Sequence, residues 1–122
     1  MAVVREKNRS HCLIPRAGIL DNRLSPGARC AWMNFISEDD TFSCSLETMC
    51  DNMKISRKTM LRYFRELVTL HYAIKILYSE IPMRAVLNDY AVFTQPASSV
   101  EKKAYVREFQ REYPNRKVIS FA

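Results

Sequence analysis

Glycine is scarce in this sequence, which holds only Gly18 and Gly27 among its 122 residues. A Gly-x-x-x-x-Gly-Lys-Ser/Thr loop is therefore absent, and its absence excludes the phosphate cradle of P-loop nucleotide-binding proteins. The two histidines have no serine or cysteine partner at a recognisable spacing, so a nucleophilic catalytic site has no support either. We therefore expect a protein without enzymatic activity and without a bound cofactor.

Cysteine pairs of the kind that bind zinc are also missing. The four cysteines are Cys12, Cys30, Cys44 and Cys50, and no two of them form a Cys-x-x-Cys motif. Residues 38–40 are acidic, and we interpret them as a solvated loop rather than a metal site. An even number of cysteines is compatible with disulfides. However, we expect no signal peptide at the N-terminus, and Cys30 and Cys50 lie beside apolar helical positions, which favours free thiols in a reducing cytoplasm.

Long hydrophobic runs are lacking as well, and the apolar stretches are far too short to span a bilayer. Acidic residues are fewer than basic ones, because 13 Asp and Glu stand against 19 Lys and Arg. The resulting net charge of +6 favours an anionic partner, although it says nothing about the fold. The length is that of one domain with a modest core.

The most informative stretch runs from residue 45 to residue 70. Ser45 is a suitable N-cap, because its hydroxyl accepts hydrogen bonds from backbone N–H groups that the first helical turn leaves free. The apolar residues after it recur at helical spacing: Leu46, Met49, Cys50 and Met53. The pattern breaks at Lys54 and Ile55, and Ser56 offers a second N-cap. We therefore predict two short helices joined by a tight turn.

The second of these helices is predicted over residues 56–70, with an apolar face and a basic face. The inward stripe consists of Met60, Phe64, Leu67 and His71. The outer face carries Lys58, Arg62, Arg65 and Thr69, with Arg57 in the first turn. Between Lys54 and Arg65 the chain has five basic residues and no acidic one. This layout is typical of a helix-turn-helix whose second helix enters the major groove of DNA.

A basic outer face is ordinarily only the solvated side of an amphipathic helix. Here the charge is of one sign, and it begins in the first turn, where cations oppose the helix dipole and cost stability. A capped helix also precedes it at helix-turn-helix spacing. These three features favour a nucleic-acid interface over the simpler interpretation.

Upstream of this motif, Ser25 followed by Pro26 is a strong signal for a helix start. The apolar face of that helix consists of Ala28, Ala31, Trp32, Phe35 and Ile36. We interpret Trp32 as the main core anchor rather than as a residue that stacks on a base. Residues 11–20 are expected to be extended, and residues 41–44 to form a short strand.

Downstream, residues 72–78 and 84–93 are rich in β-branched and aromatic residues and predict a hairpin. Residues 98–101 match a capping box, which opens a last helix that Pro114 ends. Residues 115–122 are expected to be loose.

The expected fold is α+β and mainly helical. It is a winged helix-turn-helix with a three-helix core, a β-hairpin wing and an additional C-terminal helix. Residues 1–10 form a flexible basic arm, residues 11–95 the DNA-binding domain, and residues 96–122 the C-terminal helix and tail.

The segment from about Leu24 to Phe93 resembles the winged helix-turn-helix domains of phage and plasmid replication initiators and replisome organisers. The resemblance is carried by Leu24–Arg29, Phe42–Cys50, Ile55–Leu67 and Asn88–Tyr90, and Leu13–Ala17 is similar to the family's leading strand. Cys44 stands where the family often has proline, and Leu61 stands where a polar residue is usual. We interpret Leu61 as core packing, with a thymine methyl or a partner protein as alternative contacts.

The resemblance implies sequence-specific binding of double-stranded DNA, often at repeated origin sites of a phage, plasmid or related mobile element. The expected DNA-binding residues are Lys54, Ser56, Arg57, Lys58, Thr59, Leu61, Arg62, Arg65, Lys75 and Arg84. Alternative functions are those of a transcriptional repressor or of a protein-interaction winged helix in a replication complex. Other replication proteins and a second copy of the chain are further possible partners. We expect the protein in the cytoplasm of a bacterial host, without a membrane partner.

Overall fold

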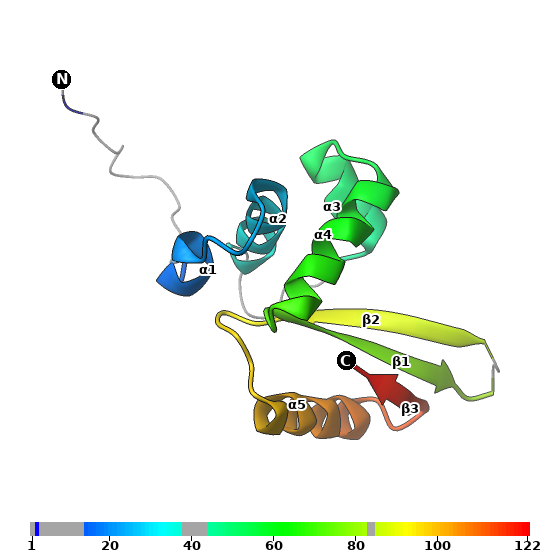
Figure 1. Ribbon diagram of the computed structural model, residues 1–122. Helices are drawn as coiled ribbons and strands as arrows, with labels where there is room; N and C mark the ends of the chain where they lie inside the picture. Colours follow the sequence, from blue (N-terminus) through cyan, green and yellow to red (C-terminus); the bar gives the residue numbers. More distant parts are fainter. Residues whose placement is uncertain (1, 3–13, 38–43, 83–84) are drawn as a thin grey trace.

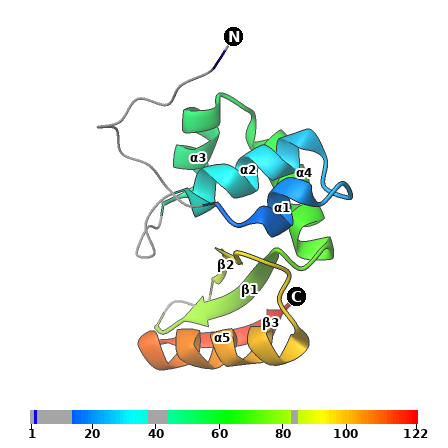
Figure 2. The same ribbon diagram turned by 90° about the vertical axis from the view of Figure 1, so that its left-hand side faces the viewer.

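The computed structural model describes residues 2, 14–37, 44–82 and 85–122. These residues form an α+β fold with five helices and one three-stranded antiparallel sheet (Figure 1). The elements are α1 (Arg16–Leu20), α2 (Pro26–Ile36), α3 (Leu46–Met53), α4 (Arg57–Thr69), β1 (Ala73–Glu80), β2 (Val86–Val92), α5 (Ser99–Glu112) and β3 (Arg116–Phe121). Helices α1 to α4, the helical lobe, lie on one side of the sheet, and α5 lies along the other (Figure 2).

Serine N-caps begin four of the helices, as the sequence predicts. The side-chain oxygens of Ser25, Ser45, Ser56 and Ser98 each accept a hydrogen bond from the backbone N–H three positions on, at 3.1–3.2 Å. Glu101 completes the capping box, because its carboxylate accepts from the backbone N–H of Ser98 at 3.3 Å. Such caps typically contribute about 1 kcal/mol each to helix stability.

The helical lobe packs around Trp32 of α2. Its indole is fully buried, donates a hydrogen bond of 2.8 Å from Nε1 to the carbonyl oxygen of Phe93, and meets the ring of Tyr72 edge-on. The other buried residues of this core are Leu24, Ala28, Ala31, Met49, Cys50, Met60, Phe64, Leu67, Tyr72 and Ala73. Trp32 is therefore confirmed as a core anchor, since its ring has no face left for a base.

The inward stripe of α4 is shorter than the sequence suggests. Its first three members are buried, but the predicted fourth member, His71, is exposed. The helix ends at Thr69, and His71 adopts a left-handed backbone conformation, with φ of 69°, that turns the chain into β1. The Nδ1 atom of His71 lies 2.7 Å from Nζ of Lys102, so the ring contacts α5 instead of the core.

The sheet has the strand order β2-β1-β3, and its two faces have different surroundings. Side chains alternate along β1, so Ile74, Ile76 and Tyr78 share one face, where they pack with Phe109 of α5 in a second core. The other face lies on the side of the helices, and we call it the lobe-side face. By alternation and register it carries Lys75, Leu77, Ser79, Val86, Asn88, Tyr90, Lys117 and Ser120.

The predicted hairpin is confirmed, but the third strand was not expected. Strands β1 and β2 pair antiparallel, with Lys75 opposite Tyr90, and residues 83–84 at the tip lie outside the described residues. The tail that the sequence suggested would be loose forms β3 and pairs with β1. This pairing satisfies backbone groups that β1 would otherwise expose, and it packs Val118 against the second core.

The prediction of an extended segment over residues 11–20 is wrong for residues 16–20, which form α1. Arg29 of α2 donates hydrogen bonds of 3.2 and 2.7 Å to the carbonyl oxygens of Gly18 and Asp21 at the C-terminal end of α1. Gly18 is buried against Trp32. These contacts hold the segment as a short helix beside α2.

Three further predictions fall wholly or partly outside the described residues. Residues 3–10 of the basic arm cannot be compared, nor can residues 41–43 of the short strand, and Cys44 has no regular secondary structure. The leading strand expected over residues 13–17 is wrong for Arg16 and Ala17, which begin α1. Within the described ranges, no helix combines the length and apolarity needed to cross a membrane.

Candidate nucleic-acid interface

Helix α4 separates its apolar and basic side chains onto opposite faces. Lys58, Arg62 and Arg65 are exposed, whereas the inward residues of the same helix belong to the lobe core. The three cations follow one another at intervals of four and three residues, so they form a single stripe along the helix. We call this set of three residues the basic stripe.

Two of the predicted DNA-binding residues, Ser56 and Thr59, have structural roles at the start of α4. Lys54 ends α3 in a left-handed conformation, with φ of 55°, and its side chain is exposed. The hydroxyl of Ser56 accepts from the backbone N–H of Thr59 and donates to the Thr59 hydroxyl at 3.0 Å. Ser56 and Thr59 are thus committed to capping α4, while Lys54 remains open to solvent.

Arg57 is paired within the protein. Its guanidinium donates to the carboxylate of Glu47 on α3, and both side chains are largely exposed, at 61% and 64%. Exposed ion pairs contribute only about 0–1 kcal/mol, so this pair exchanges readily for a stronger anion. The sequence pattern predicts that Arg57 binds DNA, but it does not reveal that Glu47 of the preceding helix competes with DNA for the Arg57 guanidinium.

A groove runs between α4 and the lobe-side face of the sheet. It is lined by Leu61, Arg65, Val68, Thr69, Lys75 and Tyr90, and we call it the α4–sheet groove. Leu61 is half-buried and lines this groove, and it does not belong to the lobe core, so its interpretation as core packing is wrong. Arg65 and Lys75 reach the groove from different elements, so the fold brings together two cations that stand ten residues apart in the sequence.

Tyr90 connects Lys75 to the lobe core. Its ring packs on Phe64 of α4 with 4.8 Å between centroids, and Nζ of Lys75 lies 5.9 Å from the centre of the Tyr90 ring. A cation over an aromatic face is attracted by the negative charge of that face. Tyr90 therefore restrains the lysine at the groove, a role that the sequence pattern does not reveal.

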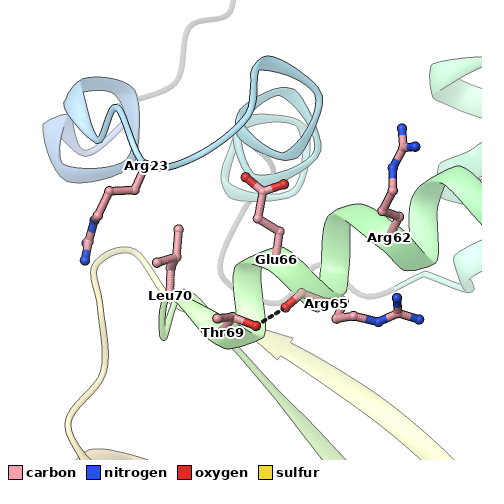
Figure 3. Close-up of a pocket in the computed structure, with 6 residues that line it drawn as sticks. All are labelled: Arg23, Arg62, Arg65, Glu66, Thr69 and Leu70. Carbon is pink, nitrogen blue, oxygen red and sulfur yellow. Dashed lines mark hydrogen bonds between the residues drawn. The ribbon is translucent and has the colours of Figure 1, made fainter.

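A second, more open depression lies on the neighbouring side of α4. It is lined by Arg23, Arg62, Arg65, Glu66, Thr69 and Leu70 (Figure 3). Glu66 points toward α2, where its carboxylate accepts from the backbone N–H of Ser25 and, at 2.8 Å, from the Ser25 hydroxyl. Arg62 and Arg65 extend away from the Glu66 carboxylate, so Glu66 does not directly neutralise either of these two arginines.

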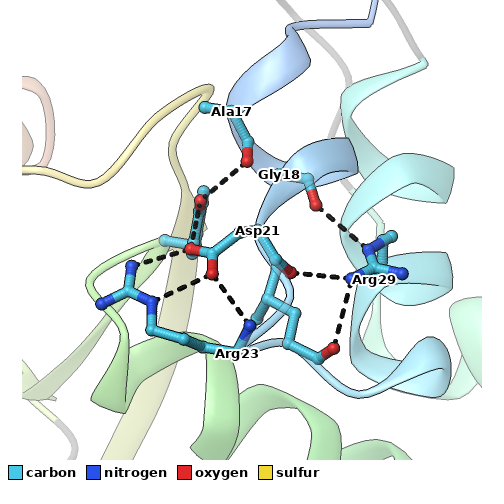
Figure 4. A network of polar contacts seen from close by, with 7 residues as sticks. Ala17, Gly18, Asp21, Arg23 and Arg29 are labelled. Atoms are coloured by element: carbon cyan, nitrogen blue, oxygen red, sulfur yellow. Dashed lines mark hydrogen bonds and ion pairs between the residues drawn. The ribbon is translucent and has the colours of Figure 1, made fainter.

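Arg23 is held at this depression by Asp21. Its Nε and Nη2 atoms donate to the Asp21 carboxylate at 2.9 and 2.7 Å (Figure 4). These hydrogen bonds hold the pKa of Asp21 well below its usual range, and the Tyr72 hydroxyl, which donates to Asp21 at 2.8 Å, lowers it further. Burial, together with the hydrogen bond to Asp21, raises the pKa of Tyr72 to about 12. This network holds α1 and the turn after it against Tyr72, the residue immediately before β1.

The predicted DNA-binding residues thus fall into three groups. The basic stripe and Lys54 are exposed, Leu61 and Lys75 line the α4–sheet groove, and the remaining described residues are engaged in capping or ion pairing. Arg84 lies outside the described residues. Arg23 and Lys117 were missed, because no sequence pattern pointed to Arg23 and because Lys117 lies in the segment that was expected to be loose.

Metal ligands do not cluster in the described part of the chain, where no three His, Cys, Asp or Glu side chains form a group suited to an ion. The acidic run over residues 38–40 lies outside that part. The thiols of Cys30, which is exposed, and Cys50, which is buried, are free. Comparison with protein-family models, curated proteins and solved structures finds no match for this chain.

Proposed function

We propose that the protein binds double-stranded DNA, with α4 in the major groove and the β1–β2 hairpin against the flanking backbone. The observation that carries this proposal is the α4–sheet groove, where Arg65 of the helix and Lys75 of the sheet line one concave surface. Each contact between such a cation and a phosphate releases condensed counterions, which is the main source of affinity for DNA. A phosphate seated in the groove would meet both side chains.

The basic stripe supplies groups that can distinguish base pairs. Lys58 and Arg62 lie in the N-terminal half of α4, the part of a helix-turn-helix that reaches base edges. A bidentate arginine on guanine contributes about 1–3 kcal/mol of discrimination. Arg65 lies beside Lys75 and is suited to the backbone, so we assign Arg62 to base recognition and Arg65 to phosphate.

The order of elements supports the winged helix-turn-helix as the class of domain. Helices α2, α3 and α4 are followed directly by a hairpin, and α3 and α4 are joined by a tight turn. The sequence resemblance to replication initiators supports origin recognition by a phage, plasmid or related mobile element as the biological role. A repressor would use the same surface, whereas a protein-interaction module would have no need of the basic stripe.

Selection of bound sites from random duplex DNA tests the proposal. We expect an enriched sequence, bound more tightly than a scrambled duplex of the same length. Arg62→Ala should weaken binding to the enriched site by about fivefold to a hundredfold, and binding to the scrambled duplex much less. Arg107→Ala is the matched control, because it removes the same charge from the exposed surface of α5 and should change neither affinity.

The outcomes separate the alternatives. No enrichment, together with no salt-dependent binding to any duplex, would overturn the proposal and favour a protein-interaction module. Enriched sites that occur as repeats within replication origins support an initiator, whereas single sites that overlap promoters support a repressor.

A further inference from the structure

The C-terminal strand β3 carries a lysine on the face of the sheet that continues the α4–sheet groove. In the register of the sheet, Lys117 stands opposite Ser79 of β1, and Ser79 shares a face with Lys75 because they are four residues apart. Lys75 and its cross-strand neighbour Tyr90 line the groove beside α4. Lys117 therefore lies further out along the same lobe-side face, where it is exposed.

The charges of the sheet are divided between its faces. Asp89 and Glu80 belong to the face that α5 covers, where Arg116 lies 3.1 Å from the Asp89 carboxylate and 3.9 Å from that of Glu80. Arg116 also packs over the rings of Tyr78 and Tyr113 at 4.7 and 4.1 Å. These carboxylates are thus neutralised on the far side. Among the described strand residues, the lobe-side face carries lysines and neutral residues but no acid.

Resting on the function proposed above, we infer that β3 is a third DNA-contacting strand and that Lys117 binds a backbone phosphate beyond the one held by Lys75. Four residues of strand separate the two positions by about 13 Å. This distance exceeds the spacing of neighbouring phosphates on one DNA strand, so the two lysines can contact different phosphates. The hydroxyls of Ser79 and Ser120 and the amide of Asn88 share this face and can donate to the same backbone.

The salt dependence of binding to a labelled duplex of mixed sequence tests this inference. Each phosphate contact adds about 0.9 to the slope of log affinity against log salt. We expect Lys117→Ala to flatten the slope by about one unit between about 50 and 200 mM salt, as Lys75→Ala should do at the groove. Lys117→Arg should keep the wild-type slope, because the charge remains.

Lys103→Ala is the matched control, since Lys103 is an exposed lysine on α5, beyond the opposite face of the sheet. Its slope should equal that of the wild type, and thermal melts followed by circular dichroism should be the same for all variants. If Lys75→Ala flattens the slope while Lys117→Ala behaves like Lys103→Ala, β3 is not part of the interface and the inference fails although the function stands. If the wild-type protein shows no salt-dependent binding, the proposed function fails and this inference fails with it.

Discussion

The ring of Trp32 lies directly against Gly18, and a Cβ atom built on Gly18 would come within 2.6 Å of the ring atom Cζ3. The backbone of α1 thus contacts the centre of the lobe core directly, because Gly18 has no side chain. The chain crosses α2 so closely at this point that every residue other than glycine would displace one of the two helices. The contact explains why a helix of only five residues keeps its place in the fold.

Gly18→Ala should lower the free energy of unfolding by about 1–3 kcal/mol, the usual cost of overpacking a core. The indole has little freedom to move away, because it is fully buried and its Nε1 is bonded to the Phe93 carbonyl oxygen. Urea denaturation of the variant and the wild type measures the difference.

Gly27→Ala is the control for this prediction. A Cβ there would also collide, but with the far end of the Tyr63 side chain, which is half-buried and therefore less confined than the fully buried indole of Trp32. Alanine in place of helical glycine also gains about 0.5–1 kcal/mol. We expect the stability of this variant to stay within about 1 kcal/mol of the wild type. Equal losses in both variants would show that the Trp32 contact has no special cost.

Tyr72 should make stability fall at alkaline pH. Burial and the hydrogen bond to Asp21 raise the pKa of Tyr72 to about 12, whereas an unfolded tyrosine ionises near pH 10. The neutral phenol therefore stabilises the fold fully below about pH 10, and this contribution is lost as the pH rises toward about 12. The loss amounts to at most about 2–3 kcal/mol.

Urea denaturation of the wild type and of Tyr72→Phe from about pH 8 to about pH 12 measures this effect. The wild type should be the more stable protein at the lower pH, and the gap should close as the pH rises. Tyr113→Phe serves as the control, because that tyrosine is exposed and its variant should follow the wild-type curve. A gap for Tyr72→Phe that stays constant with pH would contradict the assignment.

Local signals in the sequence predicted those parts of the fold that depend on local chemistry. Serine at positions 25, 45, 56 and 98 supplies an oxygen to the first turn wherever the chain allows a helix, so the starts of four helices were correct. The hairpin was correct for a similar reason, since β-branched and aromatic residues favour a half-buried strand. The inward stripe of α4 was predicted one member too long, because helical spacing extends to His71 although the backbone turns there.

Elements that exist only through tertiary contacts were the ones missed. The segment that forms α1 is short, follows Pro15 and contains Gly18, and its helix depends on Arg29 and on the Trp32 ring, neither of which is adjacent in sequence. The strand β3 depends on the free edge of β1. Its own composition, with Val118, Ile119 and Phe121 in six residues, was a usable signal that the expectation of a loose tail overlooked.

The candidate site likewise has one part that the sequence predicted and one part that depends on tertiary contacts. Helical periodicity is enough to identify the basic stripe on α4, because all three cations belong to one helix. The α4–sheet groove could not be derived that way, because it depends on Tyr90 of β2 reaching Phe64 and on the register that places Lys75 opposite Tyr90. The pairing of Arg57 with Glu47 likewise depends on how α3 crosses α4.

Glu47→Gln should tighten binding to duplex DNA. The variant removes the carboxylate that holds Arg57, which then becomes available to phosphate or guanine, and it also removes a negative charge next to the interface. Since an exposed ion pair contributes about 0–1 kcal/mol, we expect a gain in affinity of up to about fivefold. Fluorescence anisotropy with a labelled duplex at low salt measures the gain, and the slope of log affinity against log salt should steepen.

Glu108→Gln separates the release of Arg57 from a simple change in net charge. Glu108 is paired with Arg111 on the exposed surface of α5 at 2.7 Å, so the control breaks the same kind of pair on the far side of the sheet. If DNA responds only to net charge, the two glutamine variants will gain equally. If Arg57 contacts DNA, only Glu47→Gln will gain, and most of that gain will vanish when Arg57→Ala is added, because the released group is then missing. If the full gain in affinity persists in the double variant, Arg57 does not contact DNA, and the basic stripe alone is the DNA-binding surface of α4.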